Sequence, residues 1–127
     1  KIVAFEPWKI TVDTSNPFDD RSNDNNTKYA KLYTAMGLVI PENGYILYAD
    51  NNPDWSGGDH QHHYFDFWKT DFGKPVDNMT TVKAGVGYKN FEKGFVAYNR
   101  TSSEETFYLG NGTQITLGAL EGLFQSK

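Results

Sequence analysis

The stretch VGYKNFEKGFVAYN, residues 86–99, decides the fold of the C-terminal half of the chain. Two short runs rich in aromatic and aliphatic residues, 86–91 and 94–98, meet at a Glu-Lys-Gly sequence over 92–94. Runs of this length around a glycine-containing turn are typical of antiparallel strands. We therefore predict two strands here, in a half of the chain that is rich in β-structure.

The same pattern continues toward the C-terminus. Residues 106–109 and 114–117 form two further short runs, and Asn111-Gly112 lies between them. Asn-Gly between two strands is the strongest short-range signal for a β-hairpin. A last strand is expected over 120–125. The C-terminal half is therefore predicted to be an antiparallel β-meander or a small β-sandwich.

Two apolar runs in the N-terminal half predict buried strands. Residues 2–5 end at Glu6-Pro7, where proline cannot donate to a central ladder, and residues 45–49 end at Asp50. An edge strand over residues 10–12 is also expected, before a polar loop.

A helix is predicted between these two strands. Asn26 or Thr27 can cap its N-terminus, and Pro41 ends it. Its apolar residues recur at helical spacing, at Tyr29, Tyr33, Met36 and Ile40. Strand, helix and strand in this order are typical of a βαβ unit with parallel strands.

The predicted fold class is therefore α+β. Residues 1–75 form a βαβ-like, partial α/β segment with one main helix and long polar loops. Residues 76–127 form an antiparallel β-meander or sandwich, with the boundary near residues 73–81. The two segments are either separate units or one continuous domain.

Composition excludes several classes of function. The 127 residues carry 12 basic and 16 acidic side chains, which makes nucleic acid an unfavourable partner. No apolar run approaches the roughly 18 residues that span a bilayer. Cysteine is absent, so disulfides and thiol chemistry are excluded. The chain begins at Lys1 without a signal peptide, and we expect a mature, processed or excised polypeptide.

Four N-x-[ST] sequons favour an extracellular, secreted glycoprotein. Chance alone would give about 1.5 such sequons in a chain of this composition. The alternative is that asparagine and threonine simply populate turns. The acceptor positions are Asn25, Asn78, Asn99 and Asn111.

The segment over 54–75 contains all three histidines, and it is the first candidate for a metal site. His60 and His62 at i, i+2 spacing on a strand point to one face, where they can bind Zn or Cu with Asp59 or Asp66 as a third ligand. His63 completes the candidate metal-binding set. The alternative is that the histidines order a loop through hydrogen bonds. An acidic loop can hold Ca²⁺ or can simply be solvated. Its carboxylates are Asp13, Asp19, Asp20 and Asp24. No obligatory cofactor is expected.

Candidate catalytic carboxylates are Glu6 and Asp50, which follow two successive predicted strands. Functional carboxylates of parallel α/β folds lie at these strand ends. A pair of them can act as acid and base on a glycosidic bond. The alternative is a role in capping and turn hydrogen bonds.

Tryptophans Trp8, Trp55 and Trp68 are candidate platforms for a sugar ring. Trp68 lies in the run over 65–68, which also reads as a core strand. The later part of this segment, over 66–75, reads as a structural exit in which Asp66 and Asp71 hold turns.

Several of these stretches together resemble a known family. The relevant sequence is the helix over 29–40, the aromatic run over 62–68, the DFGKP stretch over 71–75 and the strand pair over 91–99. They resemble the last barrel segment and the small C-terminal β-sandwich of glycoside-hydrolase-like (β/α)₈ proteins. The resemblance implies carbohydrate chemistry in the parent family, with catalytic carboxylates at barrel strand ends.

A complete barrel of this kind needs roughly 250 residues. The resemblance therefore implies either a fragment or a module reused without catalysis, and it leaves enzymatic activity open. We expect a secreted, carbohydrate-associated module whose partner is carbohydrate or the remainder of a larger parent protein. The alternative is a non-enzymatic glycoprotein subunit of a surface layer or filament, which self-assembles as a homo-oligomer through β-strand pairing.

Overall fold

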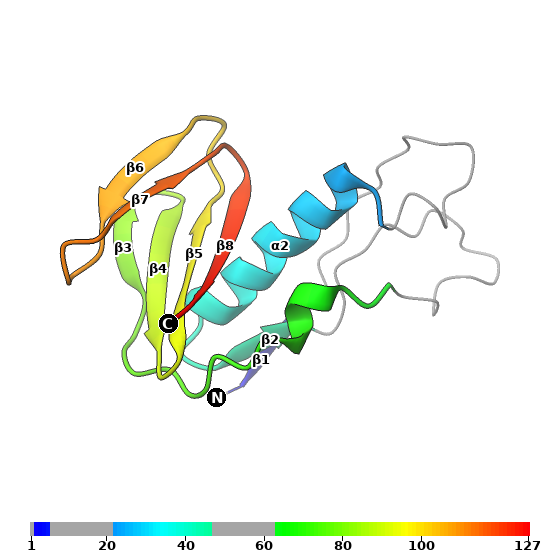
Figure 1. Ribbon diagram of the computed structural model, residues 1–127, viewed down its shortest axis with the longest axis horizontal. Coiled ribbons are helices and arrows are strands. Elements are labelled where there is room, and N and C mark those ends of the chain that lie inside the picture. Colours follow the sequence, from blue (N-terminus) through cyan, green and yellow to red (C-terminus); the bar gives the residue numbers. More distant parts are fainter. Residues whose placement is uncertain (1, 6–21, 47–62) are drawn as a thin grey trace.

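The computed structural model describes residues 2–5, 22–46 and 63–127, and it confirms the α+β class (Figure 1). The described elements are β1 (Val3–Phe5), α2 (Asp24–Val39), β2 (Gly44–Ile46), the 3₁₀ helix η1 (Asp66–Lys69), β3 (Thr80–Lys83), β4 (Val86–Phe91), β5 (Gly94–Asn99), β6 (Glu105–Tyr108), β7 (Gln114–Leu117) and β8 (Glu121–Ser126). Helix α2 is the main helix of the described residues. The C-terminal half of the chain consists of antiparallel strands.

A four-stranded antiparallel sheet in the order β3-β4-β5-β8 forms the centre of the fold. Strands β4 and β5 are the two strands predicted from residues 86–99, and they pair from Val86 opposite Asn99 to Phe91 opposite Gly94. Strand β3 was not predicted, because its sequence TTVK has a single aliphatic residue and no alternation. All four of its residues are exposed at the edge of the sheet.

The β6–β7 hairpin forms a second sheet, as the Asn-Gly signal predicts. Gly112 has a φ of 84°, which a glycine in this turn adopts without strain. Phe107 and Leu117 of the hairpin pack against Val86 and Ala97 of the central sheet. The β-rich half therefore consists of two packed antiparallel sheets, in agreement with the predicted meander or sandwich.

Helix α2 covers the opposite face of the central sheet (Figure 1). It begins earlier than the Asn26 or Thr27 caps would place it, because the side chain of Asn23 accepts a hydrogen bond from the Asn26 amide at 2.7 Å. Val39 of the helix packs with Val96 of β5 in one buried cluster. This cluster joins both predicted segments in a common core.

The parallel pair β1–β2 confirms the βαβ-like order, since α2 lies between the two strands in the chain. Val3 pairs with Gly44 and Phe5 with Ile46. The expectation that both strands are buried is wrong for their described residues, because β1 is exposed at Val3 and β2 at Tyr45. The predicted residues 47–49 and 10–12 lie outside the described part of the chain.

A polypeptide link over 63–76 connects the two halves. The run over 65–68 does not form the core strand that it resembles, because residues 66–69 turn into η1. Asp66 accepts a hydrogen bond from Lys69 within this turn, and Asp71 accepts one from the amide of Gly73 at 2.8 Å. Both carboxylates hold turns, as predicted.

A search of the described helices for a bilayer-spanning segment finds none that is both long and apolar enough.

Candidate functional site

An aromatic cluster lies where η1 packs between helix α2 and strand β8. Phe65 is buried and anchors the segment against Ala30 of the helix. The ring of Trp68 meets Tyr64 edge to face at 5.7 Å between centroids. Phe67 contacts Phe124 of β8 at 5.2 Å. Because η1 turns tightly, successive aromatic residues point to both of its neighbours and form one continuous aromatic surface.

Within the described part of the chain, the indole of Trp68 makes one hydrogen bond. Its Nε1–H donates to the hydroxyl oxygen of Thr34 on helix α2 at 2.9 Å. The indole N–H is the only hydrogen-bond donor of a tryptophan side chain. Any further contact that Trp68 makes must therefore use its ring.

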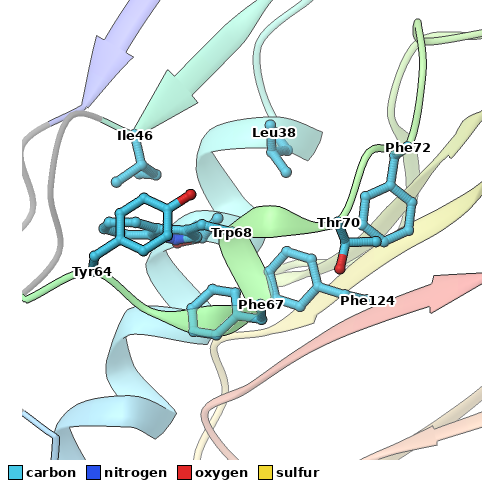
Figure 2. Close-up of a pocket in the computed structure, with 9 residues that line it drawn as sticks. Leu38, Ile46, Tyr64, Phe67, Trp68, Thr70, Phe72 and Phe124 are labelled. Carbon is cyan, nitrogen blue, oxygen red and sulfur yellow. The ribbon is translucent and has the colours of Figure 1, made fainter.

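This cluster lines a pocket with a volume of about 400 Å³. Figure 2 shows Tyr64 and Trp68 at one end and Phe72 at the other, with Thr70 and Phe124 between them. The nine described lining residues are Thr34, Leu38, Ile46, Tyr64, Phe67, Trp68, Thr70, Phe72 and Phe124. They contribute five aromatic rings and three hydroxyl groups, and none of these nine side chains carries a charge.

One ion pair neighbours the pocket without lining it. Asp66 and Lys69 of η1 are joined at 2.6 Å, and both are largely exposed. The hydrogen bond from Lys69, and then its charge, holds the pKa of the Asp66 carboxyl below its ordinary value. The same contact raises the pKa of Lys69. The two opposite charges stay paired at neutral pH, so η1 brings little net charge to the pocket.

Trp68 is the predicted sugar platform that the structure places in this pocket. His63 packs edge to face against Phe65, with 4.7 Å between ring centroids. The other candidate catalytic and sugar-binding residues and the other two histidines lie outside the described part of the chain, namely Glu6, Trp8, Asp50, Trp55, His60 and His62.

The metal hypotheses remain predictions. Over residues 2–5, 22–46 and 63–127, no group of three or more histidine or carboxylate side chains is arranged to hold an ion. Of the acidic loop, Asp24 belongs to the first turn of α2. Asp13, Asp19 and Asp20 fall outside the described residues.

Sequence reasoning missed most of the pocket. Thr34 and Leu38 read as ordinary helix positions, and Phe124 reads as part of a closing strand. The aromatic density of residues 63–68 was the one available signal. It indicates a cluster, but it does not indicate which helical residues lie opposite.

Three of the four predicted glycosylation positions, Asn25, Asn78 and Asn111, are exposed. Asn99 is fully buried. Its Nδ2 donates to the carbonyl oxygens of Ser103 at 2.8 Å, Gly118 at 2.9 Å and Leu117 at 3.3 Å. A glycan at Nδ2 needs solvent around that nitrogen, so the expectation of a glycan at Asn99 conflicts with the folded structure.

Comparisons of this chain with protein-family models, with curated proteins and with solved structures found no match.

Proposed function

We propose that this protein is a secreted, carbohydrate-associated module and that the aromatic pocket is a sugar-contact site. The supporting observation is the pocket lining: its nine described residues supply five aromatic side chains and three hydroxyl groups, and none of the nine is charged. A pyranose ring has an apolar C–H face that packs on aromatic rings, and its hydroxyl groups need hydrogen-bond partners. The lining supplies both.

The pocket supports binding rather than bond cleavage. Hydrolysis of a glycosidic bond uses two carboxyl groups about 5 to 9.5 Å apart. The described lining contains no carboxylate. Glu6 and Asp50, the candidates for that chemistry, lie outside the described residues. The proposal that this chain belongs to a larger glycoside-hydrolase-like protein is therefore supported by the sequence resemblance and not by the pocket.

Two exposed tyrosines provide a matched test of sugar binding. Tyr64 at the pocket is 60% exposed, and Tyr108 on the far hairpin is 65% exposed. The wild-type chain and the variants Tyr64→Ala and Tyr108→Ala would be applied to an array of neutral and acidic oligosaccharides. Affinities for retained sugars would then be measured by titration calorimetry.

We expect Tyr64→Ala to lose about tenfold in affinity for a neutral oligosaccharide, because about 1.4 kcal/mol of ring contact corresponds to that factor. Tyr108→Ala should bind like the wild type. A wild-type chain that retains no sugar at millimolar concentration would sink the proposal, and so would equal affinities of the two variants.

The alternative, a self-assembling subunit, draws on the exposure of β1. Val3 of β1 is 39% exposed, and Ile2, directly before the strand, is 75% exposed; β1 belongs to a two-stranded sheet among the described residues. Exposed apolar strand edges favour pairing between copies. Light scattering across a hundredfold concentration range would test this. A mass that rises with concentration and falls back to the monomer in Val3→Lys is expected. A constant monomer mass excludes it.

A further inference from the structure

We propose that Thr34 determines the specificity of the aromatic pocket, by donating its hydroxyl hydrogen to an oxygen atom of a bound neutral sugar. This inference rests on the proposed function and names the polar contact that the pocket offers. It also assigns a class of ligand, namely one or two uncharged pyranose rings.

The direction of the hydrogen bond at Thr34 follows from its partner. The hydroxyl oxygen accepts from the indole N–H of Trp68, which can only donate. A hydroxyl group has one hydrogen and two lone pairs. With one lone pair used by Trp68, the hydroxyl hydrogen remains to be donated elsewhere.

Among the described residues, that hydrogen has no acceptor. The hydrogen bond of the Thr34 side chain there is the one that it accepts from Trp68. A helical threonine commonly donates to the carbonyl group four residues earlier. Thr34 instead turns its hydroxyl toward η1. The residue is 6% exposed and lines the pocket. The hydroxyl hydrogen of Thr34 is therefore available to an oxygen atom in the pocket, where a ligand oxygen can replace water as its acceptor.

The other two hydroxyl groups indicate the shape of the ligand. Tyr64 and Thr70 are exposed residues of the same lining, and Figure 2 shows them on either side of Phe67 and Phe124 in the view. Together with Thr34 they place three hydroxyl groups around the aromatic rings. A pyranose presents several hydroxyl groups around one apolar face, and this distribution matches it.

Size and charge narrow the ligand class further. A volume of about 400 Å³ lies at the lower end of the range of roughly 300–1,000 Å³ for small-molecule pockets. This volume suits one or two sugar rings. A uronic or sialic acid would bring a carboxylate into a described lining that offers it no cation. Neutral sugars are therefore the expected class.

The test uses four neutral probes and two variants of the full chain. Cellotetraose, xylotetraose, mannotetraose and galactotetraose would be titrated into the wild type, Thr34→Val and Thr34→Ser. Valine keeps the shape of threonine and removes the hydroxyl, whereas serine keeps the hydroxyl. We expect Thr34→Val to lose about five- to tenfold in affinity for the preferred probe. Thr34→Ser should stay within about twofold of the wild type.

A second set of probes separates a direct contact from a structural role, because Thr34→Val also removes the acceptor of the Trp68 indole. Monodeoxygenated methyl glycosides of the preferred sugar would be compared on the wild type and on Thr34→Val. Loss of the sugar oxygen that faces Thr34 should weaken binding to the wild type about five- to tenfold and leave Thr34→Val unaffected. A purely structural role would weaken all probes by one common factor.

The outcomes distinguish this inference from the proposed function. If the wild type binds none of the four tetraoses, the proposed function fails. If the wild type binds and Thr34→Val binds equally well, or if both respond alike to every deoxy probe, the role of Thr34 is overturned. If Thr34→Val does not fold, a deoxy series that shows no position-specific loss on the wild type overturns it. A tetragalacturonic acid that binds as tightly as the neutral tetraoses contradicts the neutral class.

Discussion

Each face of the central sheet contains one buried polar side chain that hydrogen-bonds to backbone carbonyl groups. The two side chains differ in how far along the sequence their partners lie. The helix face consists of Lys89, Phe91, Val96 and Tyr98, which lie under α2. The hairpin face consists of Val86, Tyr88, Ala97 and Asn99, which lie toward the β6–β7 hairpin. Lys89 and Asn99 each donate to three backbone carbonyl groups.

On the hairpin face, Asn99 ties neighbouring turns together. Its Nδ2 holds the carbonyl groups of Ser103, Leu117 and Gly118, at most 19 residues away. Its Oδ1 accepts hydrogen bonds from the amide and the hydroxyl of Thr101 at 2.9 and 2.7 Å. A neutral amide is thereby fully paired, which is the condition under which a buried polar group is tolerated.

On the helix face, Lys89 ties the sheet to the end of α2. It is 1% exposed, and its Nζ donates to the carbonyl groups of Pro41, Leu38 and Glu42 at 2.5, 3.2 and 3.4 Å. These carbonyl groups lie 47 to 51 residues from Lys89 in the sequence. A cation at the C-terminal end of a helix satisfies unpaired carbonyl groups and opposes the negative end of the helix dipole.

Local closure of the hairpin and long-range docking of the helix are therefore fixed by separate polar residues. The hairpin face depends on an uncharged group within one β-rich segment. The helix face depends on a charged group that joins two segments distant in the chain. Substitutions at Asn99 and Lys89 should therefore differ in how much stability they remove, in which part of the fold they affect and in how their effect depends on pH.

The largest effect is expected from Asn99→Asp, which breaks the hairpin face. The substitution places a carboxylate oxygen against three carbonyl oxygens and removes the donor between them. A buried, unpaired charge of this kind should lower the free energy of unfolding by about 3 kcal/mol or more at neutral pH. Urea denaturation followed by circular dichroism measures the loss.

The matched control is Asn111→Asp in the exposed hairpin turn. Its Oδ1 accepts from the amide of Thr113, and aspartate can keep that bond, so a change within about 0.5 kcal/mol is expected. The deficit of Asn99→Asp should shrink on acidification, because a protonated carboxyl group regains one donor. A loss at Asn99 no larger than that at Asn111 would contradict a polar closure of the hairpin face.

A smaller and more local effect is expected from Lys89→Met, which uncouples the helix face. Methionine fills similar space but leaves the three carbonyl groups without their donor. We expect a loss of about 2 kcal/mol in the free energy of unfolding, in the range of hydrogen bonds to charged groups. Native-state hydrogen exchange should show faster exchange in the last turn of α2 than in β6 and β7.

Lys83→Met is the control for removing a lysine from the same sheet. Lys83 is exposed on β3 and forms an ion pair with Glu105 at 2.7 Å, so its loss should cost less than about 1 kcal/mol. Equal loss of protection in the helix and in the hairpin after Lys89→Met would show that the two faces are not separately fixed.

The hairpin face could be predicted from the sequence better than the helix face, because its contacts are local in the sequence and those of the helix face are not. Asn-Gly at 111–112 and Glu-Lys-Gly at 92–94 specify turns through local backbone preferences, and both turns were predicted. Lys89 sits between Tyr88 and Asn90, where alternation is consistent with a solvent-facing lysine. Its burial depends on where a helix from another segment ends, which no local pattern contains.

The candidate site divides in the same way. Trp68 was predicted as a sugar platform from the aromatic and acidic composition of its own segment. Thr34, its hydrogen-bond partner, lies 34 residues away in a helix where threonine carries no functional signal. Asn99 matched a sequon pattern, but that pattern reports on two neighbouring residues and not on burial. Sequence reasoning therefore found Trp68 in the local part of the pocket and missed the residues that other segments contribute.

The smallest expected effect is a change in stability with pH. Desolvation lowers the pKa of the Lys89 ammonium, while the nearby charges of Asp77 and Glu42 act in the opposite direction and only partly offset it. A lysine whose pKa is lower in the folded state binds fewer protons there than in the unfolded state. The burial penalty is therefore fully present below the folded pKa, and it is relieved as pH rises toward 10.5, the ordinary pKa of lysine.

The free energy of unfolding of the wild type should therefore rise relative to that of Lys89→Met between neutral pH and pH 10.5. This rise should be smaller than the loss that Lys89→Met causes at neutral pH. Tyr98 also makes the free energy of unfolding depend on pH near 10.0, the ordinary pKa of tyrosine, because burial raises the pKa of its phenol in the folded state. Tyr98 is present in both chains, so taking the difference between the two unfolding free energies cancels its contribution. Asn99 carries no titratable group, so the difference in unfolding free energy between the wild type and Asn99→Ala should not change over this pH range. A difference between wild type and Lys89→Met that is flat or falls with pH would mean that the ammonium, rather than the neutral amine, is the better partner for the end of α2.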